Sequence, residues 1–584
     1  MRASFFEFTV AMTALNTARA NTATAGHNMA NSVTPGFSRQ VVNQQAATPL
    51  NTFNRVGMFG TGSQVLGISQ IRNVHLDSRY WNESAMLGRQ FTTNLGLTLI
   101  ERRFTELDDQ SFTVHYNDVF SALSDLQTDP SNPTYRNAFI QALMSKNRNF
   151  ASQAEGLRQH QLDINSEIAG TVTLINSLGE RIAALNLQID RAELHGGVAN
   201  DLRDQRAALV DQLSGLVNIT TSETTVEGRG RFSMHINGQE FISHDNVTRL
   251  FVQRRETPLQ ETDAAGLYDI YFDLGRGTSI PFAMYSRTLS GQLRGLLDVR
   301  DGNSLRDDDG NILGPLDFRG IPYYFSQLNI MVNTVANAFN LGIGKDGNPI
   351  PGMVGHESIN PPGIPLFVGG IRNTYEFVPS PGTGAYNHIP AVYVELADGE
   401  VGDWSLIGGV WVETPGAGTH NLIEEERFEL ADPPGTGNYN REILYSTPYF
   451  TVWNIAVNPA ILADQSLLQT STNPSLGESD ASLITAFLQL QYSRDLFAGG
   501  TLFEFITSFT SDLAMDVRDA GRLEAAGERI TYLVHNQRLQ IKGVDVNEEM
   551  MNVLHFQQVF NAASRLITII NDIYDNMINR MGVS

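Results

Sequence analysis

The chain of 584 residues contains no cysteine and only three lysines, Lys146, Lys345 and Lys542. Without cysteine there is no disulfide framework, no thiol catalysis and no thiolate metal site. Almost all basic residues are arginines, whose planar guanidinium favours bidentate pairing with carboxylates in packed interfaces. Genomic base composition explains this usage equally well.

Positive charge is also scarce, because the formal net charge is -23 and no long run of Lys or Arg is present. We therefore expect no nucleic-acid partner and no anionic membrane surface. The first fifteen residues carry Glu7 inside their apolar stretch, so no cleaved signal peptide is expected. The longest uncharged stretch, residues 323–344, contains four asparagines and is too polar for a membrane-spanning helix.

Common catalytic and ligand-binding motifs are missing as well. The twelve histidines form no H-E-x-x-H, and neither G-x-x-x-x-G-K-[ST] nor G-x-S-x-G occurs. The acidic residues 307–311 lack the distal glutamate of a calcium loop, and 424–426 fit a hydrated surface edge. Trp404 and Trp411 could bind a sugar, although buried strand aromatics are the plainer interpretation. We expect no catalytic residue, no metal site, no cofactor and no enzymatic activity.

The N-terminal segment has the pattern of a long helix with very little charge. Only Arg2, Glu7 and Arg19 are charged between residue 1 and Gly36. Steps of three and four residues place one seam of small or apolar side chains along this helix. The seam consists of Phe8, Ala11, Leu15, Ala18, Thr22, Ala25 and Met29. Such a helix buries too little surface to stay folded alone and requires a partner.

The C-terminal segment, residues 546–581, is a plausible partner because it is also amphipathic. One seam contains Phe556, Val559, Ala563, Leu566, Ile570, Ile573 and Met577. A second set recurs every seven residues at Val553, Phe560, Ile567, Tyr574 and Met581. This apolar face is wide enough for more than one neighbour. A simple two-helix hairpin is the alternative that periodicity alone favours, so the pattern does not decide between them.

Between the ends, helical and strand patterns alternate, which predicts an α+β multidomain fold with helical coiled-coil layers enclosing an inserted β-rich domain. Asn237-Gly238 marks a hairpin turn in the first β-rich part. The predicted parts are an N-terminal axial helix with an extended segment (1–85), a long-helix coiled-coil layer (86–220), a small β-rich part (221–288), a helical return (289–345), a projecting β-rich domain (346–455), a second helical layer (456–540) and a C-terminal axial helix (541–584).

Two motifs resemble those of the flagellar rod, hook and hook-associated proteins. Residues 26–40 read GHNMANSVTPGFSRQ, in which Thr34-Pro35-Gly36 ends the first helix, and the ending Ser38-Arg39-Gln40 looks like the hook-associated FlgK type. Residues 543–549, GVDVNEE, and 556–563, FQQVFNAA, are similar to the C-terminal motif of the same family. We expect Asn547 to be the N-cap of the last helix, with Glu548 and Glu549 in its first turn.

Two internal stretches support the same resemblance, namely residues 201–213 and the sequence LSGQLRGLLDVRD at 289–301. The predicted β-rich insertion has no such match. Phe37 in place of the commoner Tyr, and Met550-Met551 in place of smaller residues, are mild departures that remain apolar.

The resemblance implies a structural subunit of the bacterial flagellum that forms the junction ring on the hook. It implies a homo-oligomer of about eleven copies, between hook protein and the filament-side junction protein, after delivery by the flagellar export apparatus with a cytosolic chaperone on the C-terminal helices. The expected location is extracellular. The expected subunit-packing residues are Phe8, Leu15, Asn28, Met29, Asn31, Pro35, Gly36, Arg39, Val544, Glu548, Glu549, Phe556, Gln557, Phe560, Leu566, Ile570, Ile573 and Met577.

Three alternatives remain open. The chain could be another axial subunit, hook or distal rod, or a flagellar protein whose insertion is an enzyme or an adhesin. It could also be a coiled-coil protein without a flagellar role, and then deleting residues 1–36 and 546–584 should unfold the rest. For an axial subunit we expect a folded core without these ends, which become ordered only when neighbouring copies complete their packing.

Overall fold

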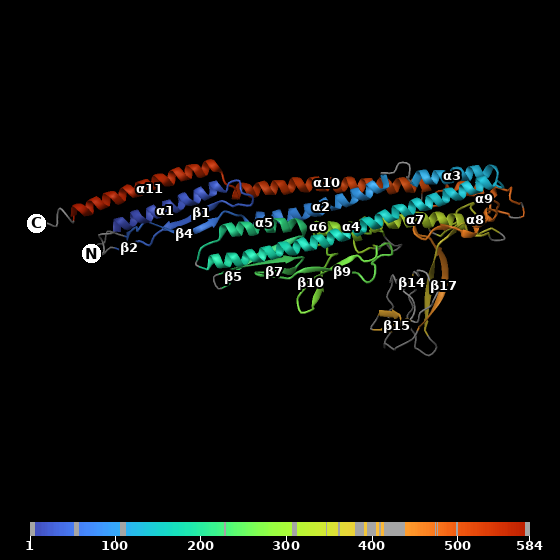
Figure 1. The fold of residues 1–584 in the computed structure, drawn as a ribbon, viewed down its shortest axis with the longest axis horizontal. Coiled ribbons are helices and arrows are strands. Elements are labelled where there is room, and N and C mark those ends of the chain that lie inside the picture. The colour runs from blue at the N-terminus through green and yellow to red at the C-terminus, as the bar shows by residue number, and fades with distance from the viewer. Residues whose placement is uncertain are drawn as a thin grey trace.

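The two terminal helices lie side by side at one tip of an elongated molecule (Figure 1). The structure, a computed structural model, describes residues 6–577 apart from 52–57, 106–111, 195, 227–228, 306–311, 313, 346, 360–362, 380–390, 394–403, 408–409, 414–438, 474, 476 and 498–499. A helical rod continues from this tip, and strands β13 and β17 leave the rod sideways near its far end. The two ends of the chain are thus far from the projecting strands.

Eleven helices are assigned within the described residues. They are α1 (Phe6–Ala30), α2 (Val74–Thr105), α3 (Phe112–Thr128), α4 (Pro133–Glu193), α5 (Asn200–Leu216), α6 (Gln292–Asp301), α7 (Ile321–Leu341), α8 (Pro459–Ala463), α9 (Ser482–Gln489), α10 (Leu502–Lys542) and α11 (Val546–Asp575). The helical rod therefore begins at Val74, ahead of the residue 86 that the sequence pattern indicates. None of the described helices is long and apolar enough to cross a membrane.

The strands form small antiparallel sheets. They are β1 (Gln40–Ala46), β2 (Leu50–Asn51), β3 (Met58–Phe59), β4 (Ser63–Gln70), β5 (Ile219–Val226), β6 (Arg229–Ile236), β7 (Gln239–Ser243), β8 (Asn246–Val247), β9 (Leu250–Arg254), β10 (Tyr268–Asp273), β11 (Ser279–Pro281), β12 (Phe367–Val368), β13 (Gly370–Pro379), β14 (Ala391–Tyr393), β15 (Trp404–Ile407), β16 (Val410–Glu413), β17 (Tyr439–Tyr449) and β18 (Ala456–Val457). The sheet orders are β1-β4, β2-β3, β5-β6-β7-β8, β11-β10-β9, β12-β18, β14-β13-β17 and β15-β16. The α+β class predicted from the sequence is confirmed.

The rod is built on α4, which runs for 61 residues, and on the antiparallel pair α2 and α10. Asn132 caps α4 by accepting a hydrogen bond from the N–H of Thr134, and Pro133 follows in the first turn. Helix α10 starts with a capping box in which Thr501 and Glu504 satisfy each other's backbone N–H groups. A Cβ atom at Gly527 of α10 would lie 2.2 Å from Oε1 of Gln90 on α2, so a larger residue there would require the flexible glutamine side chain to move.

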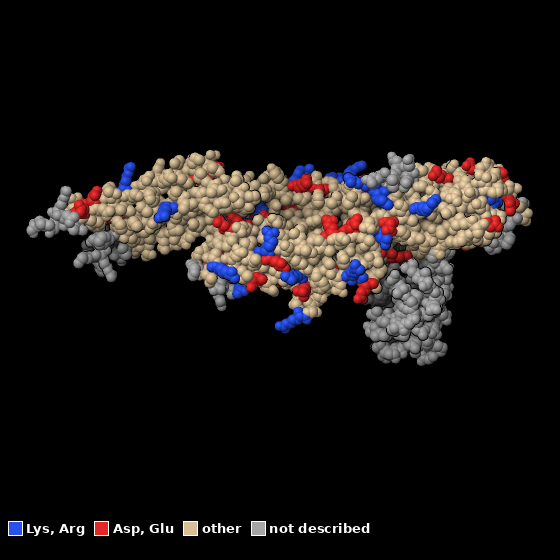
Figure 2. Space-filling model, in the orientation of Figure 1, with Lys and Arg blue, Asp and Glu red and all other residues tan. Residues whose placement is uncertain are grey.

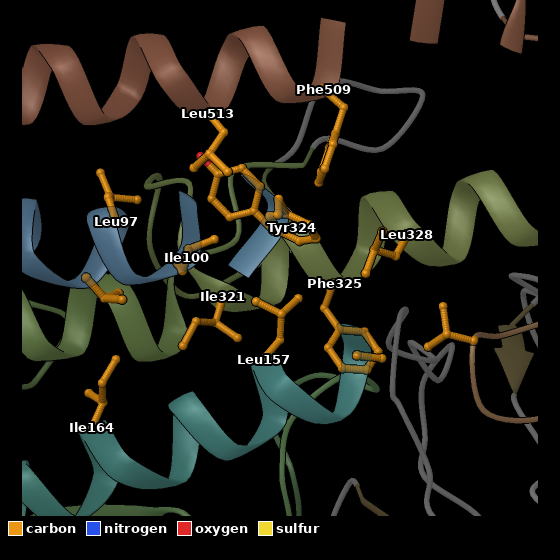
Figure 3. Packing of buried hydrophobic residues seen from close by; sticks show 14 of the residues in the cluster. Leu97, Ile100, Leu157, Ile164, Ile321, Tyr324, Phe325, Leu328, Phe509 and Leu513 are labelled. Atoms are coloured by element: carbon orange, nitrogen blue, oxygen red, sulfur yellow. The ribbon is translucent and has the colours of Figure 1, made fainter. Parts of the chain in front are cut away.

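One hydrophobic core runs through the rod and joins helices that are far apart in sequence. Figure 3 shows side chains of α2, α4, α7 and α10 meeting between the helices. Tyr324 of α7 lies edge-on to Phe509 of α10, with ring centroids 6.0 Å apart. The sequence of α4 also has the 3-4 spacing of a helical seam, and all of its members except Ala192 are buried: Ile168, Thr171, Ile175, Leu178, Ile182, Leu185 and Ile189. The 3-4 spacing in the sequence of α4 therefore identifies the face of this helix that packs against the rest of the rod.

Two sheets cover α4 on one side. The hairpin between β6 and β7 turns at Asn237-Gly238, both with positive φ (49° and 83°), which confirms the predicted turn. Helix α6, the central part of the motif at 289–301, is buried, and its charged groups are paired with one another. Arg300 binds Asp301 through two hydrogen bonds of 2.9 and 2.7 Å, and Arg255 of the loop after β9 also contacts Asp301.

The asparagines on one face of α7 hold the backbone where the chain enters and leaves the projecting strands. The amide of Asn340 exchanges two hydrogen bonds with the backbone of Phe367, at 2.8 and 2.9 Å. Asn333 and Asn329 accept from the N–H groups of Phe450 and Val452, both at 3.1 Å. The asparagines of α7 therefore satisfy backbone groups of the irregular segments on either side of the projecting strands.

The residues at 307–311 and 424–426 lie outside the described part of the chain. Trp404 and Trp411 lie in paired strands β15 and β16, but their side chains are outside the described set. Among the described residues, no group of three or more His, Asp or Glu side chains is arranged to hold a metal ion.

Candidate functional site

The segment between α1 and β1 carries the N-terminal motif and joins the terminal helices to the rod. After α1 ends, the N–H of Asn31 bonds back to the carbonyl of His27 at 3.1 Å, and Phe37 N–H bonds to Thr34 at 3.2 Å. Gly36 has a φ of 85°, a conformation that glycine adopts without strain. Pro35 is exposed on this turn. The motif thus ends the helix and reverses the chain, as the sequence predicted.

Asn28 fixes the position of the returning strand against α1. Its side chain is buried and forms two hydrogen bonds with the backbone of Gln40, donating to the carbonyl and accepting from the N–H, both at 2.9 Å. An asparagine in this position satisfies one donor and one acceptor that the short strand would otherwise leave unpaired. Asn31, by contrast, bonds only within its own turn, to His27 and Thr34.

Ser38 and Gln40 connect this strand to α5 of the rod. The backbone N–H and the hydroxyl of Ser38 donate to the two oxygens of Asp204, at 2.8 and 2.7 Å. The Gln40 side chain donates to Asp201 at 2.8 Å. Burial raises the pKa of Asp204, and the two bonds from Ser38 counteract this shift. The sequence motif at 201–213 therefore serves as the receiving surface for the motif at 26–40.

Arg39 connects the same strand to the other end of the chain. Its N–H bonds to the carbonyl of Lys542, the last residue of α10, at 2.8 Å. Its guanidinium donates to Glu549 and Glu548 in the first turn of α11, both at 2.6 Å. Burial lowers the pKa of Arg39, whereas hydrogen bonds and attraction to the two glutamates raise it. The pKa of Arg39 is raised overall. One arginine thus touches the end of one helix and the start of the next.

A buried charged cluster joins α2, α5 and α10 around Arg538, four residues before the Lys542 carbonyl that Arg39 contacts. Arg538 donates to Asp77 at 2.8 Å and to Asp211 at 3.0 and 3.1 Å, and its guanidinium lies 4.3 Å from the ring centre of Tyr80. Trp81 donates to the same Asp211 at 2.6 Å. Sequence reasoning did not identify this cluster. Its members give no local signal, because the residues that pair with Arg538 are 327 and 461 positions away in the chain.

The start of α11 differs from the prediction in one residue. Asp545, not Asn547, is the N-cap, and its carboxylate accepts from the N–H groups of Asn547 and Glu548, at 2.8 and 3.3 Å. The prediction of Asn547 was wrong because a carboxylate two residues earlier satisfies these donors and also bears the charge favoured at a helix start. Glu548 and Glu549 do occupy the first turn, as predicted.

Helix α11 presents two different apolar surfaces. The inner seam, which packs against α1, is buried or half-buried and comprises Val553, Phe556, Ala563, Ile567, Ile570 and Tyr574. The outer stripe is exposed and comprises Val559, Leu566, Ile573 and Met577. Leu566 and Ile573 are 43% and 47% exposed, whereas Ile570 between them is 2% exposed. One predicted seam is therefore divided between a covered and an uncovered surface.

The other predicted interface residues lie on α1, on α11 and just before α11, and they are either half-buried or exposed. Phe8, Leu15 and Met29 of α1 are half-buried, as is Val544 before α11. Gln557 and Phe560 are exposed on α11. On the face drawn in Figure 2, charged side chains are sparse over this tip and common along the rod. The terminal pair is helical in the single chain, contrary to the expectation of order only on assembly, but it leaves an apolar stripe open to water.

Part of the chain matches a known family model. Residues 97–349 match the flagellar hook-associated protein FlgK helical domain. This match covers α3 to α7 and the two sheets on α4, and it includes the buried motif at 289–301. The match ends before the projecting strands.

Curated proteins match over nearly the whole length. Flagellar hook-associated protein 1 of Bacillus subtilis (strain 168) is 25% identical, with 100% of this chain and 99% of that protein covered. The proteins of the same name from Escherichia coli (strain K12) and Salmonella typhimurium are 24% and 23% identical, each covering 97% of this chain and 98% of the relative. The structure of the flagellar hook junction protein FlgK from Burkholderia pseudomallei has a similar fold, with a TM-score of 0.52, 14% identity, and coverage of 80% of this chain and 100% of that one.

Proposed function

Because the chain belongs to the flagellar hook-associated proteins of the FlgK type, structural proteins of the hook-filament junction, we propose that the tip formed by α1 and α11 is its assembly surface. The observation that carries this proposal is the outer stripe of α11. Val559, Leu566 and Ile573 recur every seven residues and stay exposed, although α1 already covers the adjacent inner seam. A heptad stripe of this kind suits a further helix.

The occupant of the outer stripe is a terminal helix of a neighbouring copy. The exposed surface of α1 supports this choice, since it is composed mainly of small or uncharged residues, namely Met12, Asn16, Ala23, Gly26 and Ala30, with Arg19 as its one charge after Glu7. Small side chains allow close approach of helices, and few charges need to be desolvated there. This contact joins two different surfaces, so its repetition from copy to copy gives either a ring or a helical array. We propose a ring of about eleven copies.

The rod, held to the tip by Ser38, Arg39 and Gln40, carries the load between neighbouring components. In this proposal the ring stands on hook protein and presents the opposite surface to the filament-side junction protein. The chain reaches this extracellular position through the flagellar export apparatus, and a cytosolic chaperone covers α11 before export. The open stripe is the feature that would need such cover, because exposed apolar surface promotes aggregation.

Two other proposals fit parts of the chain. A hook or distal-rod subunit would share the terminal helices, but the ending Ser38-Arg39-Gln40 and its hydrogen bonds to α5 favour the junction protein. An adhesin or enzyme in the region of β13–β17 would add an activity to the same structural role. Changing acidic residues of that region would then abolish the activity and leave assembly intact.

Assembly in living cells tests the proposal. Cells that lack this gene should export filament protein without attaching filaments, and the intact chain should restore attached filaments and swimming. A chain carrying Leu566→Asp and Ile573→Asp should be exported and folded but should not restore attachment. A matched variant, Leu174→Asp, changes an exposed leucine of α4 in the rod and should restore swimming. Normal filaments in the deletion strain, or full rescue by the double stripe variant, would disprove the proposal.

A further inference from the structure

One of the three lysines is completely enclosed by the core of the rod. Lys146 of α4 is 1% exposed, and its amine has no hydrogen-bond partner among the described residues. Three aromatic rings surround the amine, with centroids 5.4 Å away for Tyr116 of α3, 5.8 Å for Phe150 of α4 and 5.0 Å for Phe367 of β12. Attraction to aromatic faces offsets only part of the cost of removing an ammonium group from water.

Among the residues that the structure describes, none supplies a counter-charge to Lys146. Burial alone lowers the pKa of Lys146 to about 7, without a contribution from an acidic or basic side chain. The titratable group that faces it is Tyr116, whose pKa burial raises, so that the phenol stays neutral. Further along the same aromatic packing, His356 stacks on Phe487, and burial lowers its pKa to about 4. Around neutral pH, Lys146 is therefore the group here that changes charge.

The position of the amine links this charge to the projecting strands. Phe367 lies in β12, the strand that leads into β13, and its backbone is held by Asn340. Its ring packs both over Lys146 and against Phe339 of α7, with ring centroids 6.0 Å apart. A movement of α3 at Tyr116 or of β12 at Phe367 would remove one of the rings that enclose the amine. The second of these is the point at which the projecting strands attach to the rod.

We propose that Lys146 is a proton-operated switch for the attachment of the projecting strands: the neutral amine remains among the three rings, and the protonated amine loosens α3 and β12 from α4. The unfolded chain keeps this proton up to the ordinary lysine range, whereas the closed fold releases it near neutrality. The closed packing is therefore most stable at alkaline pH and weakens as the pH falls toward about 7. Below that value its stability changes no further through this group.

The scarcity of lysine makes a direct test possible. Protein labelled with ¹³C at the ε carbon of lysine should give three signals, which the variants Lys146→Met, Lys345→Met and Lys542→Met assign. The Lys146 signal should titrate with a midpoint within about one unit of pH 7 in the intact chain. Titration of that signal in the ordinary lysine range, above about pH 9, would overturn the proposal.

The structural consequence is measured separately by hydrogen exchange of the full chain at about pH 6 and pH 8.5, corrected for the intrinsic rate. Peptides from 112–128 and 363–379 should exchange at least tenfold faster at the lower pH in the wild type and in Lys345→Met, an exposed control. In Lys146→Met, an unbranched apolar replacement, this difference should disappear. An equal pH effect in Lys146→Met, or no effect in the wild type, would contradict a switch.

Discussion

Arg39 and Glu549 lie 510 residues apart in sequence, and their side chains meet at 2.6 Å. Glu549 is 3% exposed, and the backbone of Arg39 also bonds to Lys542 at the end of α10 and to Ile71 just after β4. The two ends of the chain are therefore joined where each leaves its terminal helix. This contact converts two sequence motifs, far apart in the chain, into one structural unit that sets the direction of the tip relative to the rod.

Arg39→Ala should loosen the tip from the rod, because the carboxylate of Glu549 would remain buried without its partner. Loss of one member of a buried ion pair costs about 3–5 kcal/mol. Limited proteolysis should then show faster cleavage near residue 543 with the rod intact. Glu548→Ala is the matched control, since Glu548 is more than half exposed and its removal should cost less than about 1 kcal/mol. Equal effects of the two variants would argue against the special role of the buried pair.

Asn28→Asp should destabilise the return of β1 onto α1. The carboxylate can still accept from the N–H of Gln40, but it cannot donate to the carbonyl, which is left facing a negative charge. The expected cost is about 1–3 kcal/mol, measured as increased hydrogen exchange in residues 40–46. The same change at Asn31, whose side chain bonds only within its turn, should leave that exchange within about twofold of the wild type. A similar increase in both variants would contradict this assignment.

The pH dependence of the β9–β10 region should contain a contribution from Asp263. Burial, followed by the nearby Asp301, raises the pKa of this carboxyl to about 6. Since the folded pKa exceeds the ordinary value, the folded state holds the proton more tightly, and this stabilisation is lost as the pH rises through about 6. Relative to Asp263→Asn, the wild type should lose about 3 kcal/mol between pH 3.5 and pH 7 in chemical unfolding. A constant difference between the two proteins over this range would refute the assignment.

The regular parts of this fold were predictable because their periodicity is strong. The seam of α4, the stop at Thr34-Pro35-Gly36 and the turn at Asn237-Gly238 each depend on local geometry that a few neighbouring residues impose. Residues of the tip were also found, since α1 and α11 each carry apolar side chains at helical spacing. The sequence did not show which half of the α11 seam α1 covers, because both halves have the same spacing and the same hydrophobicity.

The charged contacts could not be predicted, because their partners are distant in sequence. Asp204 and Arg538 look like ordinary helix-surface residues until Ser38 and Asp211 are placed beside them. Lys146 gave no signal either, since a lysine in an amphipathic helix is normally solvated. The start of α11 was misassigned for a local reason, because the carboxylate of Asp545, two residues before Asn547, satisfies the N–H groups of Asn547 and Glu548.

Single substitutions on α11 separate the two surfaces of the tip. Ile570→Asp places a charge in the inner seam, where the side chain is 2% exposed, and should detach α11 from α1 in the monomer, with a cost of about 3 kcal/mol or more. Leu566→Asp, one turn earlier on the outer stripe, should leave the helix content and protease resistance of the monomer unchanged within about 0.5 kcal/mol. Circular dichroism and limited proteolysis of the full chain measure both.

Measurements of self-association test the outer stripe rather than the inner seam. Leu566→Asp should abolish ordered assembly of a monomer that is otherwise normal, because an isolated charge would have to enter an apolar helix contact. Ile570→Asp should also fail to assemble, but its monomer is already altered, so the result carries weight only for Leu566→Asp. Sedimentation at increasing concentration compares them with Thr568→Asp, a control at an exposed polar position on the opposite side of the same helix. Assembly of Leu566→Asp at the wild-type concentration would show that neighbouring copies do not use the outer stripe.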